Sequence, residues 1–293
     1  MRVAKKIPVE AESSEKIREN REFVFTQKHF AFLRNLSFEH SGIVVKDEKF
    51  DMFYARLVRR IRALGLDGFD AYCDYVGKEN NDEFGEFINA LTTNMTSFFR
   101  ENHHFEFLSN QVFPALKRRV KNGQVRIWSA GCSTGKEPYS IAMTIKESAA
   151  QLAGINCHIL ATDLDSQVLQ QAASGVYPMS RCESLGQARL KRFFHRGVNA
   201  NADKARAVAE LRSLISFKQL NLLKGWPFRE KFDVIFCRNV MIYFDEPTKN
   251  KLINRFVEQL SPGGYLFIGH SESLTEGTLN LKFVGGSVYQ KTL

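Results

Sequence analysis

The strongest constraint on the fold is a regular alternation of apolar strands and helical segments that begins at residue 125. This alternation is typical of a parallel, doubly wound sheet whose crossover connections are right-handed. The predicted strands are VRIWSA (125–130), CHILATD (157–163), LISFKQLNL (214–222), FDVIFCRNV (232–240), GGYLFIGH (263–270) and FVGGSVYQK (283–291), and the predicted helices cover 138–153, 166–173 and 248–260. The sequence therefore predicts an α/β domain over residues 125–293.

The chain before residue 125 has a different sequence pattern. Residues 1–22 are polar and lack periodicity, which predicts a mobile tail. Residues 23–91 carry apolar side chains at helical spacing, as in FDMFYARLVRRIRALG, where Gly65 is expected to end the helix. We expect a small N-terminal helical domain here, followed at 92–124 by a linker and a helix that ends near Val120.

One interval does not fit the alternation. Residues 175–213 separate a predicted helix from its expected strand by nearly forty residues. A structureless loop of that length is uncommon inside a compact domain. An inserted subdomain is the better interpretation.

Composition restricts the functional classes. The 293 residues have a formal net charge of +9, which favours an acidic partner but does not distinguish nucleic acid from an acidic protein surface. The five cysteines form no CxxC pair, so we expect free thiols and neither a zinc ribbon nor a thioredoxin motif, with no metal. The first residues lack the apolar core of a signal peptide, and no apolar run is long enough to cross a bilayer. We expect a cytoplasmic protein without membrane insertion.

The turn after the first strand, in WSAGCSTGKEPYS, indicates a ligand site. Gly131 and Gly135 are spaced GxxxG, which departs from the dinucleotide fingerprint and from the phosphate loop. Glu137 would repel a triphosphate but suits a ligand with cationic groups, such as S-adenosylmethionine (SAM). The alternative is an ordinary tight turn with an acidic residue favoured by the helix dipole.

The second strand ends in Asp163, with Asp165 close behind. An acidic residue at this strand tip can accept hydrogen bonds from both hydroxyls of a ribose. The alternative role is a helix N-cap, which fits Asp165 better than Asp163. The order of the motifs favours ribose binding by Asp163.

Several longer motifs resemble the chemotaxis receptor methyltransferases, the CheR family. They are ALTTNMTSFFRE, WSAGCSTGKEPYS, ATDLD, and FCRNVMIYF followed by GHSES, and the similarity runs from about residue 25 to the C-terminus. The resemblance implies an N-terminal helical domain, a Rossmann-like class I SAM-dependent methyltransferase domain, and a small antiparallel β-subdomain inserted at about 175–213. It also implies SAM as cofactor and S-adenosylhomocysteine as product.

The resemblance also implies site residues. Those matching family residues at the cofactor are Asn94, Thr96, Arg100, Glu137, Asp163, Asn221, Leu222, Arg238 and Asn239. Tyr243 resembles a tyrosine near the transferred methyl group, so Arg100 and Tyr243 are the candidates for orienting the reacting atoms. Simpler roles remain open: Asn94 and Thr96 as helix caps, Leu222 and Tyr243 as packed side chains. Arg238 follows an apolar strand and needs a partner, whereas His270 is expected to be a structural or pocket-wall histidine and not a base.

The implied reaction is transfer of a methyl group to a glutamate carboxylate on the cytoplasmic domain of chemotaxis receptors. A glutamate side chain, with an ordinary pKa of about 4.3, is already ionised at neutral pH, so no general base is required. Alignment of the reacting atoms and removal of water are the tasks left to the protein.

Two segments are candidates for receptor contact. Arg56, Arg59 and Arg60 are predicted to project within one arc of a helix, either as a solvated face or as a docking site for the acidic receptor. The aromatic and basic LKRFFHRG (190–197) in the insert is a candidate for binding a receptor's C-terminal tail.

Three other functions are alternatives to receptor methylation. A methylase of amino-adenine would show Pro-Pro after the strand-end Asn, and here CRNVMIY has none, so we expect no nucleic-acid partner. A methyltransferase of another acidic protein or of a small molecule is possible in principle. A non-catalytic SAM-binding adaptor is the rival from another class, and the complete set of matched cofactor residues disfavours it.

Overall fold

The computed structural model describes residues 21–78, 82–120, 123–274 and 280–292. The chain divides into two compact units, one comprising residues 1–40 and 45–91 and the other comprising 41–44 and 92–293. We call them the helical unit and the α/β unit. Most of the predicted mobile tail lies outside the described residues.

The helical unit contains α2 (Gln27–Ser41), η1 (Asp47–Lys49), α3 (Phe50–Leu64), α4 (Phe69–Val76) and α5 (Glu83–Leu91). Its core is aromatic, because Phe30, Phe53 and Phe69 are fully buried. Gly65 ends α3 in the left-handed conformation with φ +63°, as predicted. The predicted tail boundary at residue 22 is wrong, because Arg21 pairs with Asp51 and Glu22 with Arg62.

The α/β unit is built on a seven-stranded sheet with the order β6-β2-β1-β7-β8-β10-β9. Its strands are β1 (Gln124–Ala130), β2 (Asn156–Asp163), β6 (Ile215–Gln219), β7 (Phe232–Cys237), β8 (Leu260–Ile268), β9 (Leu281–Gly285) and β10 (Val288–Lys291). The five strands β6, β2, β1, β7 and β8 pair in parallel, which confirms the doubly wound α/β prediction for this part of the sheet.

The last two strands depart from the prediction. We expected one strand over 283–291, whereas β9 and β10 form an antiparallel hairpin, and β10 also pairs antiparallel with β8. Gly286 and Ser287 have φ values of +58° and +59°. Two successive positive φ values are what a tight hairpin turn requires. The glycine pair in FVGGSVYQK is thus a turn inside the predicted strand.

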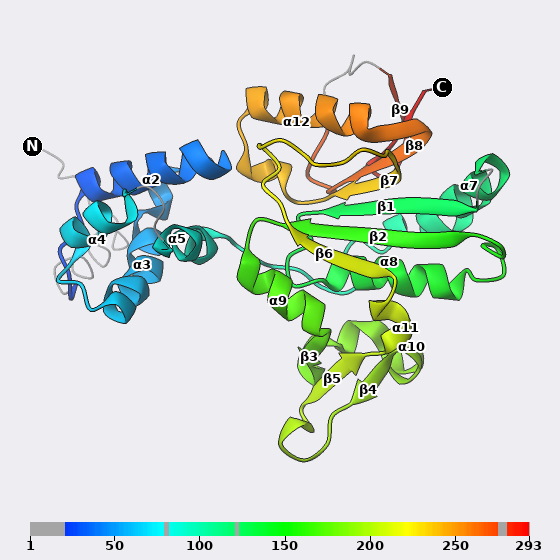
Figure 1. Cartoon of the computed structure of the whole chain (residues 1–293), viewed down its shortest axis with the longest axis horizontal. Helices are drawn as coiled ribbons and strands as arrows, with labels where there is room; N and C mark the ends of the chain where they lie inside the picture. Colours follow the sequence, from blue (N-terminus) through cyan, green and yellow to red (C-terminus); the bar gives the residue numbers. More distant parts are fainter. Residues whose placement is uncertain (1–20, 79–81, 121–122, 275–279, 293) are drawn as a thin grey trace, which may run out of the picture. The chain divides into compact units, whose positions relative to one another are not determined.

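Helices cover both faces of the sheet (Figure 1), with α8 and α9 on one side and α12 on the other. The helices are α6 (His103–Phe107), the π-helical η2 (Leu108–Val112), α7 (Phe113–Arg119), α8 (Lys136–Glu147), α9 (Ser166–Ser174) and α12 (Glu246–Gln259), with η6 (Met241–Tyr243) after β7. Val125 and Ile127 of β1 pack with the α8 face, and Trp128 and Ala130 pack with the α12 face. This alternation is what a strand buried on both faces requires.

The insert is a small antiparallel sheet with the order β3-β5-β4, which confirms the predicted subdomain. It comprises β3 (Val176–Pro178), η3 (Met179–Arg181), η4 (Glu183–Leu185), α10 (Gly186–Phe193), β4 (Phe194–Arg196), η5 (Asn199–Asn201), β5 (Lys204–Ala207) and α11 (Ala209–Arg212). Tyr177 and Phe194 each lie edge-on to Phe98, at 5.1 and 5.6 Å between ring centroids. The insert therefore shares a core with the α8 face of the main sheet.

The five cysteines are free thiols, and four of them are buried, as predicted. In the described part of the chain, no helix combines the length and apolar character needed to span a membrane.

Candidate active site

The carboxyl ends of the parallel strands collect the polar residues singled out in the sequence. β2 pairs with one edge of β1 and β7 with the other, so the chain reverses its direction of travel across the sheet at β1. Open α/β sheets bind ligands in the crevice outside such a switch point. Glu137 lies at the start of α8 and Arg238 lies after β7, so the two residues come from the two sides of this switch point.

The turn between β1 and α8 is anchored to the end of β2. The amides of Gly131 and Cys132 donate to the Thr162 carbonyl at 2.8 and 2.9 Å, and the Ser133 amide donates to Asp163 Oδ2 at 2.7 Å. Gly131 has φ +81°, and a Cβ there would lie 2.4 Å from Val240 Cγ2. The turn therefore requires glycine for both its conformation and its packing.

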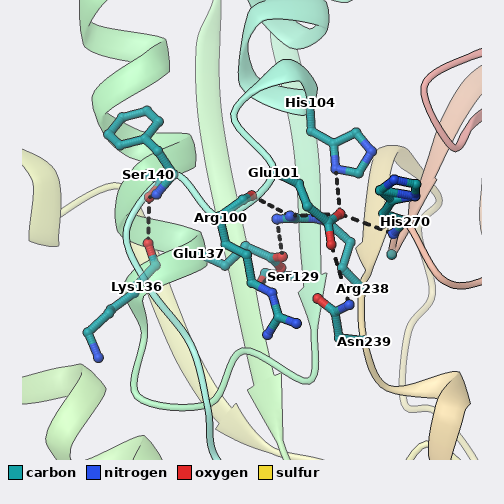
Figure 2. Close-up of polar contacts among 12 residues, drawn as sticks. Arg100, Glu101, His104, Ser129, Lys136, Glu137, Ser140, Arg238, Asn239 and His270 are labelled. Carbon is teal, nitrogen blue, oxygen red and sulfur yellow. Dashed lines mark hydrogen bonds and ion pairs between the residues drawn. The ribbon is translucent and has the colours of Figure 1, made fainter. Parts of the chain in front are cut away.

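Glu137 and Arg238 form the ion pair at the centre of the site. Arg238 Nη1 donates to Glu137 Oε2 at 3.0 Å, and Ser129 Oγ donates to Glu137 Oε1 at 2.7 Å. On its other side, Arg238 Nη2 lies 3.1 Å from Glu101 Oε2 and donates to the carbonyl oxygen of Arg100. Figure 2 shows the Arg238 side chain joined to both carboxylates. The partner that the sequence required for Arg238 is thus a pair of acids.

Burial and charge act in opposite directions on the two acids. Burial raises the pKa of Glu137 despite the adjacent Arg238 guanidinium. Burial also acts to raise the pKa of Glu101, but the charge and hydrogen bond of Arg238 together with the His270 amide bring it below its usual value. Arg238 therefore stabilises the ionised form of Glu101. At Glu137 the same guanidinium offsets only part of the effect of burial on the pKa.

Glu101 is a central residue that the sequence analysis did not single out. Its Oε1 accepts from Asn239 Nδ2 at 3.4 Å, and its Oε2 accepts from the His270 amide at 3.2 Å. His104 Nδ1 lies 3.5 Å from Oε2, and burial followed by the Arg238 charge lowers the pKa of His104 to about 4. The position of Glu101 directly after Arg100 in TTNMTSFFRE was the available signal.

Asp163 and Asp165 have separate roles at the end of β2. Burial raises the pKa of Asp163 to about 6, although the Asp165 and Ser133 amides donate to its two oxygens. Asp165 caps α9 by accepting from the amides of Gln167 and Val168, as the capping alternative predicted. Asn94 Nδ2 donates to Asp165 Oδ2 at 2.8 Å.

The interpretation of Asn94 and Thr96 as helix caps is wrong, because α5 ends at Leu91 and α6 begins only at His103, with Asn102 at its N-cap. Asn94 fixes the segment between these two helices to Asp165, and Thr96 is half-buried in it. Arg100 is exposed, and its Nη1 donates to the Met95 carbonyl at 2.9 Å.

The other predicted residues follow β6 and β7. Asn221 is half-buried, and its side chain accepts from the Leu223 amide at 2.9 Å. Leu222 packs in the core on the α12 face, which agrees with its alternative role as a packed side chain. Tyr243 is half-buried in η6, and its carbonyl accepts from the Val44 amide at 2.8 Å. His270 is exposed after β8.

The three arginines proposed for docking lie on α3 of the helical unit, and two of them have internal partners. Arg56 Nη1 donates to the carbonyls of Ala90 and Leu91 at the end of α5. Arg60 makes a bidentate pair with Glu83, at 2.9 and 2.6 Å, and the Glu83 side chain is only 2% exposed. Of the three, only Arg59 is exposed, whereas Arg56 and Arg60 are half-buried.

The chemistry of this edge fits SAM. The two Asp163 oxygens accept the backbone amides of Ser133 and Asp165, and a carboxylate has about four acceptor positions, so capacity remains for ribose hydroxyls. Glu137 supplies a buried acceptor for an ammonium group, and Arg238 Nε is buried without a hydrogen-bond partner in the described chain. Acidic groups outnumber the guanidinium at this crevice, which suits a cationic ligand. No cluster of three potential metal ligands occurs among the described residues.

An α/β sheet with a glycine turn and acidic strand tips at its switch point defines a nucleoside-binding protein of the Rossmann-like type. Comparison with known families is more specific. Residues 94–290 match the model described as CheR methyltransferase, SAM binding domain, and residues 28–92 match CheR methyltransferase, all-alpha domain.

Curated relatives agree over nearly the whole chain. The chain is 44% identical to chemotaxis protein methyltransferase 2 of Pseudomonas aeruginosa, covering 92% of this chain and 95% of the relative. It is 43% identical to the chemotaxis protein methyltransferases of Salmonella typhimurium (89% of both chains) and Escherichia coli (89% of this chain, 90% of the relative). The chain belongs to the CheR methyltransferase family and is a SAM-dependent methyltransferase.

Proposed function

We propose that this protein transfers the methyl group of SAM to glutamate side chains of chemotaxis receptors and forms glutamate methyl esters. The observation that carries the proposal is the Glu137–Arg238 pair beside Asp163 at the switch point of a CheR-family sheet. The printed names of the relatives connect the family with chemotaxis. When bound, SAM supplies an electrophilic methyl group on a sulfonium centre.

The cofactor residues divide by the contacts they offer. Asp163 would accept hydrogen bonds from the ribose, and Glu137 would accept from the ammonium group of the methionine part. Asn221 and Leu222, after β6, would hold the adenine. Arg238 keeps Glu137 in place, because its Nη1 holds that carboxylate and its Nη2 holds the turn at Arg100.

The substrate end of the site needs orientation more than acid–base chemistry. The attacking glutamate is ionised at neutral pH. The proposed reaction therefore needs no general base, and we assign none. Holding the reacting atoms in line can supply roughly 7–11 kcal/mol of the barrier. Arg100 and Tyr243 carry this role, with Thr96 and Asn239 beside them.

Arg100 is suited to a substrate contact because its guanidinium is exposed and forms a single described bond, to a backbone carbonyl. A tight salt bridge to the substrate carboxylate would reduce its nucleophilicity. We therefore assign Arg100 to positioning of the bound groups and not to full neutralisation of the substrate.

The partner is the cytoplasmic domain of a receptor, so we place the protein in the cytoplasm. Among the three arginines predicted for docking, Arg59 on α3 is the exposed one and is our candidate for contacting an acidic receptor helix. The insert, with the edge strand β4 and the basic segment 190–197, is the candidate for binding a receptor's C-terminal tail.

The proposal is tested by incubating the protein with methyl-labelled SAM and receptor-bearing membranes. Base-labile label that is released from the receptor as volatile methanol identifies a glutamate methyl ester. Label that stays on the receptor after base treatment contradicts ester formation. Binding of S-adenosylhomocysteine without any transfer favours the adaptor alternative.

A further inference from the structure

The loop after β7, residues 238–244, carries Arg238, Asn239 and Tyr243 and is held by a buried carboxylate. We call this segment the β7 loop. The carboxylate belongs to Glu272, which follows the end of β8 and is 9% exposed. Glu272 is neither in our set of cofactor residues nor among those assigned to the reacting atoms.

Glu272 binds backbone amides on two strand ends. Its Oε2 accepts from the Gly269 amide at 2.6 Å and from the Asn239 amide at 3.1 Å. Its Oε1 accepts from the Ile242 amide at 3.2 Å. One side chain thus joins the end of β8 to both halves of the β7 loop. Buried amides without such an acceptor would each cost about 1–3 kcal/mol.

The β7 loop needs this support because its backbone is strained. Asn239 has φ +58°, in the left-handed region. Its side chain is held by Glu101 and its amide by Glu272, so the conformation is fixed from two sides. A Cβ at Gly269 would lie 2.6 Å from Asn239 Nδ2 and 2.9 Å from Glu272 Oε2, so the three groups are in close contact. Strain of this kind persists only when surrounding contacts enforce it.

We propose that Glu272 is a positioning residue for methyl transfer, whose carboxylate sets the backbone of the β7 loop and through it the placement of Asn239 and Tyr243. Glu272 acts without touching cofactor or substrate. The inference rests on the proposed function, because it assumes that the β7 loop borders the reacting atoms.

Asp233 provides a matched control at the other end of the same strand. It is also a largely buried carboxylate, with a side chain 13% exposed, and it accepts from the Arg126 amide at 3.0 Å and from Arg119 Nη2 at 2.8 Å. It lies at the amino end of β7, away from the candidate site. Asp233→Asn therefore reports the loss of a structural carboxylate alone.

The experiment compares Glu272→Gln, Glu272→Asp and Asp233→Asn in the full chain. Glutamine keeps the shape but directs an NH2 group at amides that need an acceptor, whereas aspartate keeps both acceptors and is one methylene shorter. The measurements are melting temperature, affinity for S-adenosylhomocysteine, kcat and KM with receptor membranes, and amide hydrogen exchange at residues 239 and 242.

We expect Glu272→Gln to lower kcat at least tenfold, weaken S-adenosylhomocysteine binding about tenfold, and accelerate amide exchange at both positions. Receptor KM should stay within twofold, and Glu272→Asp should recover part of kcat. Asp233→Asn should reduce the melting temperature by a similar amount and keep kcat within twofold.

Equal kcat losses in Glu272→Gln and Asp233→Asn at matched melting temperature would overturn the positioning role, as would unchanged exchange at residues 239 and 242. Failure of the proposed function appears separately, as a wild-type protein that does not methylate receptors. In that event the exchange rates and the S-adenosylhomocysteine affinity still decide whether Glu272 sets the β7 loop.

Discussion

At the scale of single residues, the site is a set of acids whose properties come from burial and from one buried guanidinium. Arg238 separates Glu101 from Glu137, and the two acids respond differently, since the pKa of Glu101 is lowered and that of Glu137 is raised. Asp163 lies outside this pair, and burial raises its pKa to about 6. Its charge therefore changes close to neutral pH.

This pKa gives a pH dependence for cofactor binding. Below about pH 6 the Asp163 carboxyl becomes protonated and loses acceptor capacity for ribose hydroxyls, so affinity for S-adenosylhomocysteine should fall as pH falls, by about tenfold per unit below 6. Titration calorimetry from pH 5 to 8 measures this.

Asp163→Asn should bind at least about tenfold more weakly at pH 7.5 and should show a flatter pH profile. Asp245→Asn, which alters the half-buried N-cap of α12, is the control and should keep the wild-type profile. A wild-type affinity that does not change between pH 7.5 and 5 contradicts the ribose role.

Arg100→Ala tests the substrate end of the site. Because the side chain is exposed, the free energy of unfolding should change by only about 0.5 kcal/mol, whereas turnover should fall by roughly 100-fold if positioning is lost. Receptor methylation rates and chemical denaturation give the two numbers. Arg118→Ala, on the exposed surface of α7, serves as the matched control, and near wild-type turnover in Arg100→Ala would reject the role.

At the scale of elements, the turn between β1 and α8 links the candidate cofactor residues on neighbouring strands. Gly131 contacts Val240 of the β7 loop, and the Ser133 amide bonds to Asp163. A change in this turn is therefore transmitted to both sides of the switch point.

Gly131→Ala should weaken S-adenosylhomocysteine binding, because its Cβ would displace Val240 and the β7 loop. Gly154→Ala is the matched control: its φ of +82° is nearly the same as the +81° of Gly131, but a Cβ there meets nothing within 4 Å. Both variants should lose about 1–2 kcal/mol of unfolding free energy from the left-handed backbone. Only Gly131→Ala should lose further stability and affinity, as followed by calorimetry and thermal melts.

At the scale of the whole molecule, our proposal divides the tasks between the two units: the α/β unit carries the candidate cofactor residues, and α3 of the helical unit carries the arginine proposed for receptor docking. The arginines of α3 are not equivalent. Arg60 neutralises the buried Glu83, whereas Arg59 is exposed. Charge reversal therefore has different consequences at two adjacent positions.

Arg59→Glu should raise receptor KM several-fold and leave melting temperature and S-adenosylhomocysteine affinity unchanged. Arg60→Glu should destabilise the helical unit by about 3–5 kcal/mol, because it leaves Glu83 buried beside a like charge. Steady-state kinetics and denaturation of the full chain separate the two effects. Unchanged receptor KM in Arg59→Glu would remove α3 as the docking surface.

Local sequence was sufficient for the features that depend on neighbouring residues. Apolar runs predicted the five parallel strands, Gly131 and Gly135 marked the turn, and the long interval at 175–213 indicated the insert. Each of these signals is a periodicity or a backbone preference carried by a short segment, so it can be recognised without knowing the rest of the chain.

Only the tertiary structure decided which groups meet. The pairing of Arg238 with Glu137 and Glu101 joins residues more than one hundred positions apart, and Arg60 finds its partner on another helix. The hairpin of β9 and β10 likewise depends on pairing with β8. Contacts of this kind arise from packing of distant segments. The structure, and not the sequence pattern, therefore identified Glu101 and Glu272 and showed that Arg56 and Arg60 have partners on α5.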